Sequence, residues 1–302
     1  MLETMMTNRV PKALQDRHAL LLVAVSLTVG ICMATAQAAE TRKEARIDIA
    51  AGGTLNIVNN GGSVILHSGS GRQILVTYVT HSEKIEVDQN TSGNKERVEL
   101  RTHALPNEKP SADEAKVDYD VTVPAGISVN VSTASAPITG EGLNGDIGLS
   151  SETGQITLQN VVKSHVRVRS MTAGVSLKDV TMSRVDLQSA GGAILLNNVT
   201  GQRVTAGTTS GNIEYHGDCS GGGDYILTTH SGAIDVTLPP TASVDLTARS
   251  TTGPVENAFP LQDKPHNSFV PRQGRSFAGT SNSGSSSVEL QSFSGKIRVK
   301  KQ

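Results

Sequence analysis

The chain of 302 residues contains no tryptophan, and its four tyrosines and four phenylalanines leave aromatic residues at 3%. Its hydrophobic residues, 36% of the total, must therefore form a core made mostly of valine, isoleucine, leucine and alanine. Rings that stack on sugars are nearly absent, which argues against a polysaccharide-degrading enzyme. The composition is neither collagen-like nor that of a highly charged disordered chain.

Basic residues form no long block, and the formal net charge is −1. Proteins that hold nucleic acids through phosphate contacts carry clustered lysine and arginine, so no nucleic-acid partner is expected. Two catalytic signals are also missing. There is no G-x-S-x-G nucleophile motif, and residues 221–224 (GGGD) lack the Lys-Ser/Thr of a phosphate-binding loop.

Residues 1–38 are typical of a secretory signal peptide. Three basic residues precede an apolar stretch over residues 19–33, and an Ala-Gln-Ala cleavage pattern ends at Ala38. We expect cleavage after Ala38 and export to the periplasm or the cell surface; an uncleaved segment would instead anchor the chain and give its membrane contact. Cleavage would remove Cys32 and leave Cys219 without a disulfide partner.

An internal repeat of nineteen residues or slightly more is the strongest pattern in the chain. Apolar residues recur seven and five positions before, and two and four positions after, a small reference residue, and 30 of these 32 sites are apolar. Successive reference residues are 18, 19, 19, 19, 21, 21 and 42 positions apart. They are Ala136, Gly154, Ala173, Gly192, Gly211, Gly232, Gly253 and Gly295.

Each repeat unit contains two short apolar-x-apolar segments joined by a four-residue turn. A period of two places both apolar side chains of a segment on one face of a strand. A two-strand unit cannot bury that face alone, whereas stacked units can. The pattern predicts an all-β fold, a parallel β-solenoid (β-helix) of roughly 19-residue coils, over residues 129–300.

Serine or threonine occupies 15 of the 16 positions that lie three residues and one residue before the reference residues. Small hydroxyls fit a tight corner and hydrogen-bond turn backbone or the neighbouring coil. We expect a structural ladder along this corner; the alternative is an exposed surface that binds ice or a glycan.

Residues 46–128 precede the regular repeats. They contain one further coil pattern at residues 55–66, followed by alternating runs that polar loops divide. We expect an N-terminal first coil with an antiparallel β cap, because a bare solenoid end exposes both strand edge and core. A second irregular segment, the excursion of residues 258–286, interrupts the last repeats.

Three stretches resemble a known family: residues 55–62 (LNIVNNGG) its opening strand, residues 117–133 its entry into the repeats, and residues 274–297 its closing coil. The family is a bacterial envelope domain family of unknown function, catalogued as an adhesin with β-strand repeats. The resemblance covers about residues 46–300. It implies the fold and an envelope setting, but no catalytic residues. This chain has Ala136-Pro137 and Ala173 where the family commonly has glycine.

Three carboxylates form the first candidate site. Glu214, Asp235 and Glu256 lie three residues after successive reference positions, so we expect them to stack outward on three successive coils, roughly 5 Å apart. Such a column suits Ca²⁺, and a carboxyl pair at this distance also suits a retaining glycosidase. The simpler expectation is a solvated acidic edge that Arg298 closes beside Glu256.

Two further sets complete the candidates. Phe259, Phe269 and Phe277 of the excursion either pack on the solenoid as a cap or form a recognition surface. The residues His216, Asp218, Cys219 and His230 match no zinc-finger spacing, so we expect them to be mixed loop residues.

We therefore expect an exported, non-enzymatic envelope protein that binds a polymer or protein partner or acts as a scaffold. The first alternative is a β-helical polysaccharide-degrading enzyme that uses the acidic column. The second is a membrane-anchored structural or regulatory protein of the envelope. No catalytic residue and no cofactor is assigned, apart from the possible Ca²⁺.

Overall fold

The computed structural model describes residues 40–302, except residue 220 and residues 264–271. The expected signal peptide and Phe269 therefore lie outside the described residues. This part of the chain contains 25 strands in two sheets, which we name sheet A and sheet B. Over the same described ranges, no helix is both long and apolar enough to cross a membrane.

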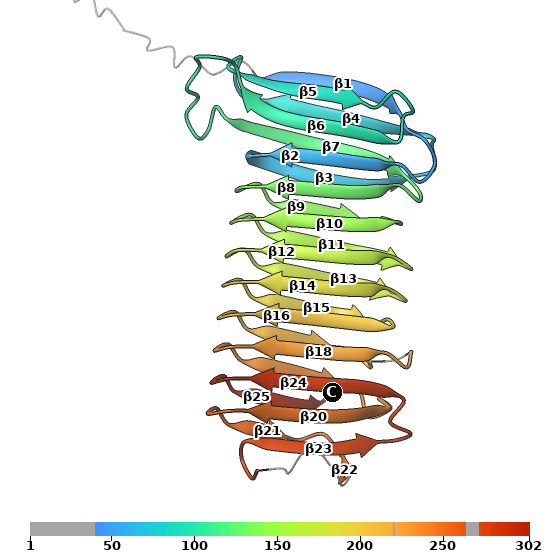
Figure 1. Cartoon of the computed structure of the whole chain (residues 1–302), viewed down its shortest axis with the longest axis vertical. Helices are drawn as coiled ribbons and strands as arrows, with labels where there is room; N and C mark the ends of the chain where they lie inside the picture. The colour runs from blue at the N-terminus through green and yellow to red at the C-terminus, as the bar shows by residue number, and fades with distance from the viewer. Residues whose placement is uncertain (1–39, 220, 264–271) are drawn as a thin grey trace, which may run out of the picture. The chain divides into compact units, whose positions relative to one another are not determined.

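The two sheets lie face to face as a stack of coils (Figure 1). In spatial order, sheet A contains β1 (Thr41–Asp48), β4 (Gln73–Thr80), β7 (Lys116–Pro124), β3 (Gly61–Gly69), β9 (Ile138–Glu141), β11 (Ile156–Val162), β13 (Val175–Thr181), β15 (Ile194–Val199), β17 (Ile213–His216), β19 (Ile234–Leu238), β25 (Ile297–Lys301) and β21 (Val255–Asn257). Sheet B contains β22 (Gln262–Asp263), β23 (Ser276–Ser281), β20 (Val244–Ser250), β24 (Ser286–Ser292), β18 (Asp224–Thr229), β16 (Arg203–Thr208), β14 (Arg184–Ser189), β12 (His165–Ser170), β10 (Asp146–Ser151), β8 (Ser128–Thr133), β2 (Thr54–Asn59), β6 (Arg97–Ala104) and β5 (Ile85–Thr91).

Each coil contributes one strand to each sheet, and neighbouring coils pair in parallel with equivalent positions in register. Val166, for example, pairs with Ile147 of the preceding coil and with Val185 of the next. The apolar columns of both sheets are almost completely buried and form one core. The predicted all-β parallel solenoid is confirmed.

The N-terminal end combines parallel and antiparallel strands. The first coil, β2 and β3, stacks directly on β8 and β9. Strands β6 and β7 extend the two sheets beyond it in parallel, and β4, β5 and β1 then add in antiparallel orientation. The antiparallel cap is confirmed for these outer strands, whereas the inner layer of the cap continues the parallel stacking. The edge strand β1 is mostly exposed and rich in charged residues, which disfavours edge-to-edge association.

The last two coils are not stacked in sequence order. Strand β24 lies between β18 and β20, and β25 lies between β19 and β21. The final coil of the chain therefore inserts under the coil that precedes it in sequence. The excursion explains this order. Strand β23 pairs antiparallel with one edge of β20, so β24, which follows β23 in the chain, can pair only with the other edge of β20, the one that faces β18.

Buried hydroxyls hold the first corner of each coil. The Gly192 N–H donates a hydrogen bond to Ser189 Oγ over 2.9 Å, and five other glycine corners repeat this bond. Where alanine replaces glycine, the hydroxyl is the donor instead of the acceptor: Ser170 Oγ donates to the Ala173 carbonyl over 2.7 Å. The hydroxyls one residue before the reference donate to carbonyls of a neighbouring coil. The predicted structural ladder is confirmed.

Glycine recurs at the reference positions because neighbouring coils approach closely there. A Cβ placed on Gly192 would lie 1.8 Å from the Ala173 carbonyl oxygen, and one on Gly211 would lie 2.1 Å from that of Gly192. Real Cβ atoms are never this close to a backbone oxygen, so a side chain here must push two coils apart.

Replacement of Gly192 by alanine is expected to lower the free energy of unfolding by about 3 kcal/mol, since overpacking against backbone cannot relax through a side-chain rotation. Gly174→Ala is the matched control, because its Cβ would meet no atom closer than 3.8 Å. Equal denaturant midpoints for the two variants would contradict this account of the corner.

The coil spacing grows from 19 to 21 residues where the core contains its one buried cysteine among the described residues. Cys219 packs beside Tyr215 and Tyr225, whose rings meet edge to face at 5.8 Å. The Cys219 N–H donates to the Tyr215 hydroxyl over 3.3 Å, and Ser286 Oγ donates to the Cys219 carbonyl over 2.6 Å. Cys219 is thus a core residue, while His216 and His230 are exposed.

Burial raises the pKa of the Cys219 thiol from 9.0 to about 12. The folded state therefore keeps this proton where the unfolded state loses it, so stability is full below pH 9 and falls as the pH rises toward 12. We expect the free energy of unfolding to fall by up to about 1.4 kcal/mol per pH unit in this window, and we expect this fall to be smaller in Cys219→Ala. A thiol reagent at pH 8 should react with Cys219 only in denaturant, whereas the exposed cysteine of a Ser210→Cys, Cys219→Ala variant should react at once. Rapid labelling of native Cys219 would contradict its burial.

Candidate functional site

The predicted acidic column is interrupted. Because the last coil is inserted, Arg298 pairs in register with Asp235 on one side and with Glu256 on the other. The expectation that Glu256 stacks directly on Asp235 is therefore wrong, and only Glu214 and Asp235 are neighbours.

Each of these carboxylates lies near a basic group. Arg298 contacts Asp235 through two guanidinium nitrogens, at 2.6 and 2.9 Å, and the carboxylate raises the pKa of Arg298 through this hydrogen bond. Lys296 lies 2.7 Å from Glu256, and His216 lies 3.9 Å from Glu214. The arrangement is a surface ion-pair cluster, in agreement with the simpler of the two expectations.

The phenylalanines of the excursion pack inward where they are described. Phe259 is 2% exposed and belongs to the core, and Phe277 on β23 is partly buried against it. Phe259 is thus unsuited to ligand contact, which corrects that candidate, and the capping role is supported for both residues.

Three groups that could hold a metal ion meet elsewhere, in the N-terminal cap. Ligand atoms of Glu86, Asp88 and His103 lie within 4.8 Å of one another. The carboxylates of Glu86 and Asp88 are accessible to solvent, and His103 Nδ1 lies 3.5 Å from the Asp88 carboxylate. An exposed cluster of this kind also forms without a metal, so we assign no site to it.

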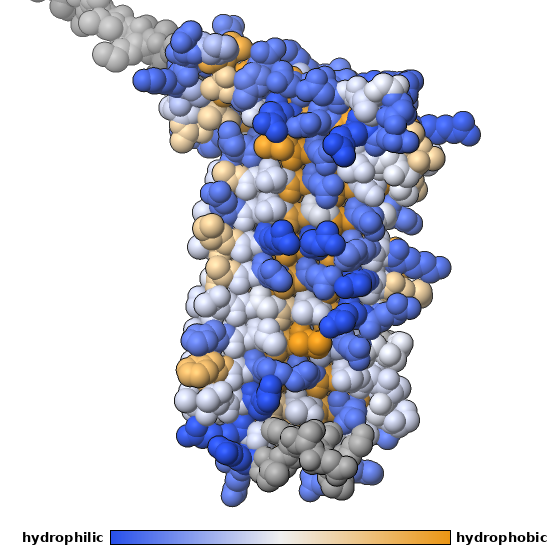
Figure 2. All heavy atoms as spheres, viewed as in Figure 1, coloured by the Kyte–Doolittle hydropathy of each residue, from blue (hydrophilic) through white to orange (hydrophobic). Residues whose placement is uncertain are grey.

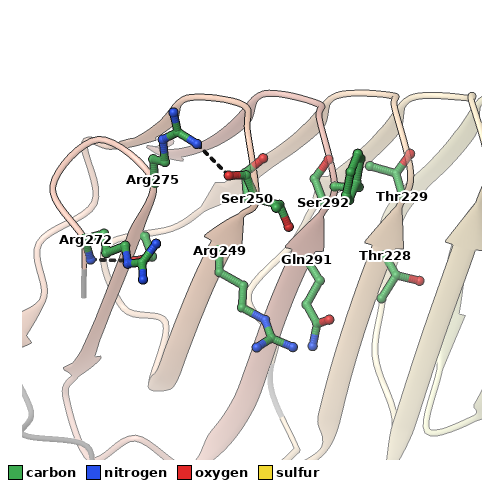
Figure 3. Close-up of a pocket in the computed structure, with 11 residues that line it drawn as sticks. Thr228, Thr229, Arg249, Ser250, Arg272, Arg275, Gln291 and Ser292 are labelled. Carbon is green, nitrogen blue, oxygen red and sulfur yellow. Dashed lines mark hydrogen bonds between the residues drawn. The ribbon is translucent and has the colours of Figure 1, made fainter. Parts of the chain in front are cut away.

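A pocket near the C-terminal end of the stack has a different character. Strands β18, β24 and β20 lie side by side, and their register aligns Thr228, Gln291 and Arg249 in one row. These residues alternate with buried ones, so they face outward. Figure 3 shows the three side chains projecting from the same side of adjacent strands. The space they border has a volume of about 730 Å³.

The segment that leads into β23 adds two arginines to this pocket (Figure 3). Arg275 Nη1 donates to the Thr251 carbonyl over 2.6 Å, which holds this guanidinium at the rim. The Arg272 backbone N–H donates to Ser276 Oγ over 2.7 Å and so fixes the turn. The Arg249 guanidinium has no hydrogen-bond or ion-pair partner within the described ranges.

No aspartate or glutamate lines the pocket among the residues that the structure describes. Its polar lining consists of arginines, serine and threonine hydroxyls and one glutamine amide. A guanidinium offers paired N–H donors that match the oxygens of a carboxylate or phosphate. The arrangement therefore favours an anion over a cation.

An exposed aromatic pair adjoins the arginines. Phe293, which lines the pocket, is 49% exposed, and its ring stacks on that of His230 at 4.8 Å with an interplanar angle of 3°. The two rings belong to successive coils, so the coil spacing itself sets this stack. The Phe293 ring gives the pocket a flat aromatic wall beside its cationic groups.

We did not predict this pocket from the sequence, although one of its residues stands out in the repeat pattern. Arg249 lies at an outward repeat position, four residues before Gly253, where other repeats have small or neutral polar residues or Arg169. Arg272 and Arg275 lie in the excursion, where no repeat defines a position. Their approach to Arg249 depends on the antiparallel pairing of β23, which periodicity does not predict.

Structural comparison finds solved proteins of low sequence identity. A candidate adhesin from Bacteroides fragilis NCTC 9343 is 10% identical with a TM-score of 0.47, and the match covers 86% of this chain and 97% of that one. A candidate lipid-binding protein from Parabacteroides distasonis ATCC 8503 is 11% identical with a TM-score of 0.46, covering 86% and 96%.

A search among curated proteins gives no significant match. The sequence does match a family of unknown function, the toastrack domain DUF4097, over residues 53–300. This match spans both the capped first coil and the closing coil, as the resemblance in the repeat pattern implied. The chain therefore belongs to the toastrack DUF4097 family.

Proposed function

We propose that this protein is a non-enzymatic binding module of the bacterial envelope that holds an anionic ligand in the pocket of Arg249, Arg272 and Arg275. The observation that carries the proposal is that three arginines line one space that no described carboxylate lines. Charge-assisted hydrogen bonds from arginine to carboxylate or phosphate are among the stronger polar contacts in proteins.

The surface around the pocket supports a polar ligand. On the face shown in Figure 2, polar residues cover most of the molecule, and apolar residues appear only as narrow bands and isolated spots. The exposed large apolar residues of the described part are scattered over many coils. An extended apolar patch of several hundred square ångströms, such as marks many protein-binding sites, is not seen on this face.

The envelope setting is part of the proposal and rests on the N-terminal sequence pattern and on the family resemblance. A basic start, an apolar middle and a small-residue cleavage pattern are typical of exported proteins. Exported binding modules meet surface polymers that carry carboxylates and phosphates, which is the chemistry that the arginine pocket fits.

Arg249→Ala is expected to weaken the binding of an anionic probe about tenfold or more, because a hydrogen bond to a charged group contributes about 1.5–3 kcal/mol. Titration calorimetry with trigalacturonate and with inorganic phosphate would measure this, and the two probes separate carboxylate from phosphate recognition. Arg203→Ala is the matched control, since Arg203 is exposed on β16 of the same sheet but lies outside the pocket.

Binding should also weaken as salt is added, because exposed charges are screened. Failure of the protein to bind either probe, or an equal loss in both variants, would overturn the proposed pocket. Release of reducing ends from polygalacturonate would support the enzymatic alternative instead.

A further inference from the structure

The arginine pocket is one end of a longer row of outward side chains on sheet B, which we name the central row. Its members pair in register from strand to strand and, except for Ser276 of the excursion, lie four residues before a reference position. From β8 to β23 they are Ser132, Ser150, Arg169, Gln188, Gly207, Thr228, Gln291, Arg249 and Ser276.

The central row contains no carboxylate. The parallel row two residues earlier on the same strands does contain them, as Asp186 on β14 and Glu289 on β24. Asp186 is already engaged, by His165 at 3.2 Å and Arg184 at 3.4 Å, and Glu289 accepts a hydrogen bond from Gln291. A chain with repeated negative charges therefore meets least repulsion along the central row.

A second hollow opens on this row about four coils before the first. It has a volume of about 440 Å³ and lies over Gly148, where the ladder formed by Asn56 and Asn130 ends. Arg167 and Arg169, both exposed on β12, border it. Neither arginine has a hydrogen-bond or ion-pair partner in the part of the chain that the structure describes.

One acidic residue, Glu99, also borders this hollow, and it is paired with Arg101 at 3.2 Å. The hollow therefore keeps a net positive lining. It repeats the chemistry of the first pocket, in which guanidinium groups stand among hydroxyl and amide groups.

The two arginine sites are too far apart for one small ligand. Strand β12 and strand β20 are separated by five strand steps, through β14, β16, β18 and β24. At the usual spacing of paired strands this is about 24 Å. The intervening positions of the central row have short or neutral side chains, and Gly207 has no side chain that would project above the sheet.

We propose that an extended acidic polysaccharide lies along the central row and engages Arg169 with Arg167 at one point and Arg249 with its neighbours at another. The inference rests on the proposed function of the first pocket and names its ligand as a long chain. Arginine binds the acidic groups, while hydroxyl and amide side chains of the row both donate to and accept from sugar hydroxyls. The exposed Phe293 ring supplies a flat wall for one sugar face.

The test compares trigalacturonate with dodecagalacturonate on the same protein. A chain that reaches both sites gains effective concentration at the second, so the dodecamer is expected to bind at least about tenfold more tightly than the trimer. An Arg167→Ala, Arg169→Ala variant should reduce the affinity for the dodecamer to that of the trimer at the first pocket, where the trimer should still bind. Arg203→Ala should change neither, because its position lies four residues along the strand from the central row.

A second pair of variants tests the path between the sites without altering them. Gln188→Glu places one carboxylate in the middle of the central row and should weaken dodecamer binding severalfold while sparing the trimer. Gln159→Glu makes the same change on the outer face of sheet A and should have no effect. All of these side chains are partly or fully exposed, so unfolding midpoints should match that of the parent protein.

Equal affinities for the dodecamer and the trimer would overturn the extended path and leave the proposed function intact. If the parent protein binds neither the dodecamer nor the trimer, the proposed function itself is overturned. Equally tight binding of inorganic polyphosphate of matched length would overturn the choice of a polysaccharide and show a row that recognises charge alone.

Discussion

The contact between successive coils at the glycine corner is the constraint on which the stack depends. A carbonyl oxygen of one coil occupies the space that a Cβ of the next coil would need at Gly192, Gly211 and Gly232. Because the coils cannot shift there without a clash, the strands on both sides of the corner stay in register. Every outward side chain then lies beside its equivalent in the neighbouring coil, and the rows across sheet B are the direct result. The His230–Phe293 stack follows from the same spacing.

The regular part of this architecture could be predicted from the sequence because it is made of repeated local patterns. Alternation fixed which residues face the core, and the corner hydroxyls and glycines marked each turn. At the opposite corner, Asn160, Asp179 and Asn198 recur at equivalent positions and adopt positive φ angles, which asparagine and aspartate tolerate well. The order of the last two coils could not be predicted, because the repeat pattern is the same for either order and the pairing of β23 with β20 lies outside that pattern. Whether Glu256 adjoins Asp235 depends on that order, which is why the expected acidic column was wrong.

The candidate site was missed for a related reason. Its residues come from a repeat strand, β20, and from the irregular excursion, and only the pairing of β23 with β20 brings them together. Insertion of β24 adds Gln291 between Thr228 and Arg249, so the same event that separated the acidic residues built the row that borders the pocket. Sequence periodicity describes contacts between equivalent positions, and two of the three arginines of this pocket, Arg272 and Arg275, have no equivalents in the other coils.

The face of a regular stack has little depth, since each coil presents the same short outward side chains. Depth arises where the regularity fails: at Gly148, which lacks a side chain in an outward position, and at the C-terminal end, where the excursion rises beside β20. Two such hollows joined by a shallow neutral row favour a ligand that is itself long, thin and repetitive. Each contact with such a ligand is weak and exposed to solvent, so affinity must come from several contacts made at once. Specificity then depends on the spacing of the arginines along the stack, which the glycine corners hold constant.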